Sequence, residues 1–284
     1  MIIDFHTHTF PDTIAHKVIP NLAMCSTTKP YTDGTMGGLF QSMKEAGISI
    51  SINLPVATSA DKVTSLNESL TPYTHNDKYS VITFAGMHPD CKNYAKELRS
   101  IKSRGFLGIK LHPAYQGADF DDIRYMRILE EAASLELITV VHAGIDIGIR
   151  DHNYSSVNQI LHVLKEVAPK KLVLAHMGGW ADWAHVESDL CGADVYFDAA
   201  FTIGPIEPYP GAKSHEYSQC TLTDDAFVRI ARKHGMNKLL FATDSPWQSQ
   251  KRYAERFGTF DFTETELSQF FYENAASLLD LEKG

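Results

Sequence analysis

Residues 1–10, MIIDFHTHTF, join a short apolar run to two histidines that stand one residue apart. The apolar run predicts a first strand over Met1–Phe5. Side chains alternate between the two faces of a strand, so His6 and His8 share one face while Phe5 takes the other. No glycine follows this strand, whereas a doubly wound open sheet carries a glycine-rich phosphate turn there. The stretch therefore favours a parallel barrel in which Phe5 packs against the helices and both imidazoles point inward.

Seven further short apolar runs follow along the chain and are predicted to be strands. They are Ile48–Leu54, Ser80–Gly86, Gly108–Leu111, Leu137–Val141, Lys171–Ala175, Ala193–Phe197 and Lys238–Ala242. Segments with apolar residues at a spacing of three to four lie between several of them, which is typical of helices. A strand and a helix repeated eight times predict an α/β fold, the (β/α)8 TIM barrel. Since no repeat, linker or second unit is evident, we expect a single domain over residues 1–284.

Helices are expected in six of the segments between and after the strands. They are Met36–Ala46, Asp119–Ser134, Val157–Val167, Trp180–Leu190, Asp224–Lys233 and Glu264–Leu281. Gly47 suits the end of the first of these helices, and Thr263 suits the N-cap of the last. We expect irregular structure over Pro11–Asp33 and Phe201–Thr221. Long loops inside compact domains tend to bind or cover ligands.

The composition is that of an ordinary globular protein, with 284 residues, 44% of them hydrophobic and 21% charged. The net charge is −9 and no basic run occurs, which argues against a nucleic-acid partner. No apolar run of about 18 residues predicts a membrane span, and no signal peptide is evident. None of the four cysteines has the spacing of a metal or redox motif, which suits reduced thiols, so we expect a cytoplasmic protein. A small-molecule substrate is the expected partner, and a homo-oligomer is left open.

Six of the eight expected strands end in residues that bind metals or move protons. These residues are His6, His8, His88, Lys110, His112, His142, His176 and Asp244. The carboxyl ends of the strands in a TIM barrel lie at one face, where the active sites of this fold are built. We therefore expect these side chains to meet at one rim.

Imidazoles together with one carboxylate suit a borderline divalent ion, and zinc is the ion that this set favours. Such an ion lowers the pKa of a bound water to about 7, which makes a nucleophile at neutral pH. We expect His6, His8, His142 and Asp244 to bind the metal, and Asp244 also to accept the proton of the water. His176 is either a further ligand or a catalytic histidine. An isolated histidine pair could equally lie on the surface, so the prediction depends on the whole set.

Lys110 allows three interpretations. It could form a salt bridge with Asp4 or Asp198, act as an electrostatic group in catalysis, or be carboxylated and bridge two metal ions. We favour an unmodified lysine in the pocket, and the number of ions, one or two, stays open.

Five further residues are candidates for substrate binding: His88, His112, Arg150, Trp180 and Trp247. The two histidines precede prolines, which restrict how the chain leaves the strand, so they could also be structural. Arg150 follows His142 in sequence and could pair with a substrate carboxylate, although it could equally be a surface arginine. The two tryptophans could form walls of the pocket or cover helix ends.

The segments DFHTH, GIKLHP, VVHAG, LAHMGG and ATDSP, in this order, resemble the amidohydrolase superfamily, and most of all its amidohydrolase-2 branch. That branch includes TIM-barrel metal-dependent hydrolases and enzymes similar to aminocarboxymuconate-semialdehyde decarboxylase. The resemblance runs from residue 4 to residue 279. It implies that the four expected ligands hold a metal, and that His176 is the catalytic histidine or binds a second ion. Binuclear members carry a carboxylated lysine at the place of Lys110, whereas the decarboxylase-like members are mononuclear.

Three functions are compatible with these residues. The leading one is hydrolysis of a small ester, lactone, amide or related electrophile by a metal-activated water, with His176 or Lys110 stabilising the oxyanion. The second is non-oxidative decarboxylation of a small carboxylic acid, a lyase reaction, on the same metal. The third is a barrel that binds metal without catalysis, in which protein groups would close the coordination shell.

Overall fold

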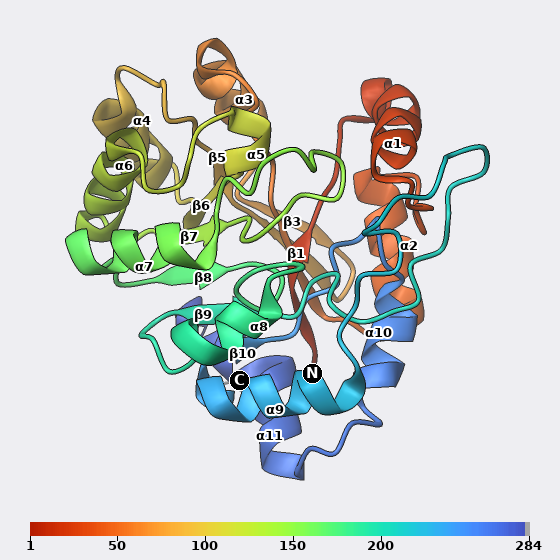
Figure 1. Ribbon diagram of the computed structural model, residues 1–284. Helices are drawn as coiled ribbons and strands as arrows, with labels where there is room; N and C mark the ends of the chain where they lie inside the picture. Colours follow the sequence, from red (N-terminus) through yellow and green to blue (C-terminus); the bar gives the residue numbers. More distant parts are fainter. Residues whose placement is uncertain (282–284) are drawn as a thin grey trace.

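The computed structural model describes residues 1–281 and has a barrel of short parallel strands surrounded by helices (Figure 1). The parallel strands are β1 (Ile3–Thr7), β2 (Ile50–Asn53), β4 (Tyr79–Thr83), β5 (Ala85–Gly86), β6 (Gly108–Leu111), β7 (Ile138–Val141), β8 (Leu172–Leu174), β9 (Tyr196–Asp198) and β10 (Leu239–Leu240). Each of the eight predicted strands overlaps an observed one, and the run Ser80–Gly86 overlaps both β4 and β5. The prediction of a TIM-barrel fold is confirmed.

The strands form two sheets that meet at both pairs of edges. Their orders are β1-β2-β4-β3 and β10-β9-β8-β7-β6-β5. Only Phe84 separates β4 from β5. Its N–H donates to the carbonyl of Asn53 at 2.9 Å, an ordinary hydrogen-bond distance. At the other edge the N–H of Phe5 donates to the carbonyl of Phe241 at 2.8 Å, which joins β1 to the residue after β10. Strand β3 (Tyr73–Asn76) pairs antiparallel with β4 and was not predicted, because its sequence YTHN is polar.

The orientation predicted for Phe5 is wrong. Phe5 belongs to a buried cluster that includes Val140 of β7, which lies four strand positions from β1 around the barrel. It therefore points inside the barrel and not toward the helices. The β1–β2 pairing shifts register between Asp4 and Thr7, and such an irregularity re-aims side chains, so His6 also turns inward. Asp4 instead accepts hydrogen bonds from Thr243 and from Gln250.

The helices around the barrel are α1 (Asp12–Ser26), α2 (Met36–Ala46), α3 (Val63–Ser69), α4 (Tyr94–Ser103), α5 (Pro113–Gln116), α6 (Ile123–Ser134), α7 (Val157–Glu166), α8 (Trp183–His185), α9 (Asp224–His234), α10 (Gln250–Phe257), α11 (Glu264–Ser268) and α12 (Asn274–Leu278). Helix α2 has the predicted bounds, with Thr35 as its N-cap and Gly47 in the left-handed region (φ 68°). Helix α6 begins later than predicted because the side chain of Asp122 caps it through the N–H of Arg124.

Two of the predicted helices are interrupted. The C-terminal helix begins with a capping box at Thr263, as predicted, but a π-helical turn, η4 (Gln269–Glu273), separates α11 from α12. The segment predicted as helix from Trp180 begins only at α8 and continues as a π-helical turn, η2 (Val186–Leu190). Trp180 instead lies at the strand ends, where its backbone forms an isolated parallel β-bridge with Gly144.

Helix α1 corrects the prediction of an irregular segment over Pro11–Asp33. Pro20 lies inside this helix, where proline is unfavourable, but Ala15, Ile19 and Ala23 form a buried face that stabilises the helix. Residues 201–221, all of which the structure describes, form neither helix nor strand, as predicted. They lie against the end of α1, where the N–H of Tyr209 donates to the carbonyl of Thr27 at 2.9 Å.

No helix within residues 1–281 is long and apolar enough to cross a membrane.

Candidate metal centre

A cavity of about 220 Å³ lies at the carboxyl ends of the strands. It is lined by nine of the predicted site residues, namely His6, His8, Lys110, His112, His142, His176, Trp180, Asp244 and Trp247. Apolar side chains from α1 and from the loops complete its walls, among them Val18, Leu22, Phe10, Ile145 and Phe201. The helix missed in the sequence therefore contributes to the cavity.

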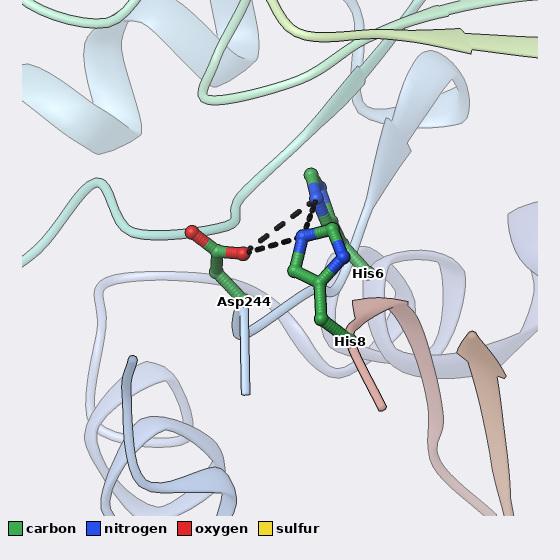
Figure 2. Close-up of side chains that lie close together, drawn as sticks. All are labelled: His6, His8 and Asp244. Carbon is green, nitrogen blue, oxygen red and sulfur yellow. Dashed lines mark hydrogen bonds and ion pairs between the residues drawn. The ribbon is translucent and has the colours of Figure 1, made fainter. Parts of the chain in front are cut away.

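His6, His8 and Asp244 converge at the floor of this cavity (Figure 2). Nε2 of His6 is 3.1 Å from Nε2 of His8, and Oδ1 of Asp244 is 3.1 Å from Nε2 of His8 and 3.6 Å from Nε2 of His6. The backbone fixes this arrangement, because the N–H of Asp244 donates to the carbonyl of His6 at 2.8 Å. Strand β1 and the end of the last strand thus present all three groups together.

The ring nitrogens that face one another carry no proton. Nδ1 of His8 donates to the carbonyl of Leu54 at 2.8 Å, and Nδ1 of His6 donates to Oδ2 of Asp198 at 2.8 Å. A neutral imidazole has one N–H, so Nε2 of each ring has no proton and carries a free lone pair. Two lone pairs and a carboxylate oxygen within 3.6 Å of one another repel unless a cation lies among them. The three residues therefore fit a divalent ion, with Asp198 holding the ring of His6 in place.

Burial and neighbouring charges support these protonation states. Burial, together with the charge of Lys110, lowers the pKa of His6 well below its ordinary value. Burial acts to raise the pKa of Asp244, but the imidazoles of His6, His8 and His176 around it outweigh burial and lower that pKa. Neutral imidazoles and an ionised carboxylate are the forms that bind divalent ions.

Lys110 lies beside this group and is completely buried. Its Nζ is 3.3 Å from Nε2 of His6, and burial lowers its pKa to about 8. Among residues 1–281 no carboxylate lies within ion-pair distance of Lys110, so neither predicted salt bridge is formed. Asp198 pairs with His6 instead, and Asp4 binds Thr243.

A second pair of imidazoles, His142 and His176, lies next to the first. Nε2 of His176 is 3.0 Å from Nδ1 of His142, and the rings of His6 and His176 lie with their centroids 5.3 Å apart. His176 (φ 59°) and Asp244 (φ 67°) both have left-handed backbone. Residues other than glycine rarely adopt this conformation, and such backbone strain gathers at functional sites.

His112, His142 and Asp146 form another group with potential ligand atoms. Nδ1 of His112 accepts the N–H of Tyr115 and caps α5, so its Nε2 carries a proton that points to Oδ2 of Asp146, 3.5 Å away. The rings of His112 and His142 are stacked, with 4.2 Å between centroids and 15° between planes. Parallel rings do not aim their nitrogens at one point, so this group suits hydrogen bonding better than a metal.

Two predicted substrate-binding residues lie elsewhere. Of the residues that the structure describes, His88 and Arg150 do not line the cavity. Nδ1 of His88 accepts the N–H of Asp90, and the exposed guanidinium of Arg150 donates to the carbonyls of Cys25 and Ile147. Trp180 does form part of the wall, and its Nε1 donates to the carbonyl of Phe201 at 3.2 Å.

Asp146 is a buried carboxylate of the cavity that was not predicted from the sequence. It is buried, and burial raises its pKa to about 6. It stands four residues after His142 in the segment HAGIDIG, just past a strand end. A carboxylate at that place could have been singled out by the same argument that singled out Asp244.

Structures of similar fold are known for several enzymes. A dihydroxybenzoic acid decarboxylase from Polaromonas sp. JS666, solved with manganese and an inhibitor, is 14% identical with a TM-score of 0.67, covering 100% of this chain and 98% of that one. A 5-carboxyvanillate decarboxylase from Sphingomonas paucimobilis is 12% identical with a TM-score of 0.67, covering 99% of each chain. A Pseudomonas putida protein provisionally named a 2-pyrone-4,6-dicarboxylic acid hydrolase is 15% identical with a TM-score of 0.64, covering 100% and 98%.

A search of curated proteins found no match. The family model for amidohydrolases, in contrast, matches residues 3–281, nearly the whole chain. The chain therefore belongs to the amidohydrolase superfamily, in its amidohydrolase-2 branch.

Proposed function

We propose that this chain is a metal-dependent hydrolase of a small ester, lactone, amide or related electrophile. The observation that carries the proposal is the set of proton-free imidazole nitrogens and one carboxylate at the cavity floor, beside the buried amine of Lys110. A divalent ion bound there supplies Lewis acidity and lowers the pKa of water to about 7. The manganese in the similar Polaromonas structure supports a divalent ion of this kind.

Each residue of the site has a separate role in binding the ion or in the reaction. His6, His8 and Asp244 hold the ion, with His142 and His176 beside them. Asp244 accepts the proton of the attacking water and passes it to the leaving group, because its carboxylate lies at the cavity floor in ionised form. Lys110, whose pKa of about 8 keeps it mostly protonated at neutral pH, donates to the developing oxyanion. The apolar walls exclude bulk water from the reacting groups and strengthen these interactions.

Non-oxidative decarboxylation of a small carboxylated compound is the second candidate, and the names of the similar structures favour it at least as well. The apolar walls around the cavity suit an aromatic substrate. The expected clamp for the substrate carboxylate, Arg150, lies outside the cavity, so Lys110 is the cation that would pair with it. The two candidates share the metal and differ in the bond that is broken.

The deciding experiment follows the oxygen of water and the release of carbon dioxide. Protein loaded with zinc or manganese is incubated in H2¹⁸O with lactones, esters, amides and hydroxylated benzoates. We expect ¹⁸O in the acid product and no carbon dioxide. Release of carbon dioxide without incorporation of ¹⁸O would overturn the hydrolase proposal in favour of the lyase.

A matched pair of variants shows whether turnover belongs to this site. Asp244→Asn removes the ionised carboxylate, and we expect turnover to fall by at least about 100-fold, the lower end of what a general base contributes. Asp151→Asn changes an exposed aspartate of the loop after β7 and leaves turnover unchanged.

A further inference from the structure

Asp146 brings a carboxylate to an apolar part of the cavity wall. Its neighbours in the chain, Ile145 and Ile147, line the same cavity, and only 5% of Asp146 is exposed. A buried carboxylate in such surroundings costs free energy unless hydrogen bonds compensate it. The hydrogen bonds that the protein supplies to each of its two oxygens therefore show what is left for a ligand.

One oxygen of this carboxylate is used by its own loop. Oδ1 of Asp146 accepts the N–H groups of Gly148 and Ile149 at 2.8 and 2.9 Å, which fixes the orientation of the side chain. An asparagine could accept the same two bonds through its amide oxygen. The loop therefore accounts for Oδ1, but it does not account for an acceptor at the place of Oδ2.

Oδ2 of Asp146 faces two rings that also line the cavity. It lies 3.5 Å from Nε2 of His112 and 4.0 Å from Nε2 of His142. Both distances exceed the roughly 2.7–2.9 Å of a charge-assisted hydrogen bond. Oδ2 therefore keeps most of its capacity to accept hydrogen bonds, and it keeps that capacity at the cavity wall.

His112 supplies a donor beside this acceptor. Nδ1 of His112 accepts the N–H of Tyr115, so the proton of the neutral ring is on Nε2. Burial lowers the pKa of His112, which favours the neutral ring. Nε2–H of His112 and Oδ2 of Asp146 thus form a donor and an acceptor that stand side by side, 3.5 Å apart.

A hydroxyl group complements both members of this pair through one oxygen atom. Its oxygen accepts from His112 while its proton is donated to Asp146. An ammonium group cannot accept from His112, and an ether or a carboxylate cannot donate to Asp146. A carboxylate would also be repelled by Asp146, and the one lysine or arginine among residues 1–281 that lines the cavity, Lys110, lies at the floor beside His6.

We propose that Asp146, together with His112, selects substrates that carry a hydroxyl group away from the reacting bond. Contacting rings lead from His112 through His142 and His176 to His6, with 4.2, 4.7 and 5.3 Å between successive centroids. Two rings therefore separate the pair from the histidines at the cavity floor. The inference rests on the proposed function only in that it takes this cavity as the substrate site.

Binding of three small probes tests the inference without any reaction. Benzyl alcohol donates and accepts hydrogen bonds, benzyl methyl ether only accepts, and benzylamine, as an ammonium ion, only donates. Their Kd values are measured by ligand-observed NMR on zinc-loaded and on EDTA-treated protein at pH 7.5, above the pKa of about 6 of Asp146. We expect the alcohol to bind at least about tenfold more tightly than the ether, as for a hydrogen bond to a charged group, and more tightly than the amine.

Asp146→Asn should abolish this preference. Gly148 and Ile149 hold the amide oxygen at the place of Oδ1, so the NH2 group replaces Oδ2 and the acceptor becomes a donor. The alcohol and the ether can both accept from this group, so we expect their Kd values to agree within about twofold. Asp151→Asn, at an exposed position of the same loop, should keep the preference of the wild type.

Equal binding of the alcohol and the ether by the wild type would overturn the inference, and so would tighter binding of the amine. A preference that disappears in EDTA would also overturn it, because the hydroxyl would then bind the ion. These results are measured on the wild type, so they decide the question even if the variant does not fold. A preference that persists in Asp146→Asn would equally exclude the role of the carboxylate.

The failure of this inference is distinct from the failure of the proposed function. Hydrolysis by a protein that binds the alcohol and the ether equally would refute the inference and leave the function standing. A preference for the alcohol in a protein that hydrolyses none of the esters, lactones and amides would support the inference and refute the function.

Discussion

Replacing Lys110 by methionine removes a completely buried amine that lies beside the imidazole of His6. Methionine fills a similar volume and needs no solvation, so it can occupy the same space in the barrel. If Lys110 serves the reaction and not the fold, its removal should stabilise the metal-free protein while it impairs turnover. Such an opposition between stability and activity is typical of functional groups in buried sites.

The pKa of Lys110 gives the size of the effect and its dependence on pH. Burial lowers this pKa from 10.5 to about 8. At about 1.4 kcal/mol for each pKa unit, the charged amine costs the folded state about 3 kcal/mol. The cost is complete below pH 8, where the amine is charged in both the folded and the unfolded state. It declines between pH 8 and 10.5 and vanishes above, where both states are neutral.

Urea unfolding in EDTA at pH 7 and at pH 10 measures these differences. We expect Lys110→Met to have a free energy of unfolding about 2 to 3 kcal/mol above that of the wild type at pH 7, and a much smaller gain at pH 10. Lys102→Met, at an exposed position of α4, should show neither effect. A Lys110→Met variant that is less stable than the wild type at pH 7 would refute the reasoning, because it would make the amine a structural group.

Three further outcomes follow from the structure. His8→Asn removes one ligand of the ion. Zinc at 100 times the wild-type Kd stabilises the wild type by about 2.7 kcal/mol. In a thermal melt, the same zinc concentration should raise the Tm of the variant much less than that of the wild type. Arg150→Gln should leave kcat/KM within about twofold, since surface changes away from a site are small, and a 100-fold loss would show that Arg150 reaches the substrate. Phe5→Ala should lower the free energy of unfolding by about 3 to 5 kcal/mol in urea, and a loss below 1 kcal/mol would contradict its place inside the barrel.

The strands could be predicted because each is a short apolar run buried on both sides, and such runs are visible in the sequence. Helix α1 was not predicted, because Pro20 lies inside it and the burial of Ala15, Ile19 and Ala23 depends on the tertiary structure. The face of β1 on which the side chain of Phe5 lies could not be predicted either. Period two predicts one face for each residue, and the register irregularity in the β1–β2 pairing breaks that period.

For the site, the chemical groups at the strand ends could be predicted from the sequence, because parallel strands bring their carboxyl ends to one rim. The sequence could not determine their proton positions. The carbonyls of Leu54 and Ala200 and the carboxylate of Asp198 fix the tautomers of His8, His176 and His6. The tertiary structure also decided that Asp146 faces His142 and that Arg150 lies outside the cavity. These contacts join residues from different loops and strands, and such hydrogen bonds leave no periodic trace in a sequence.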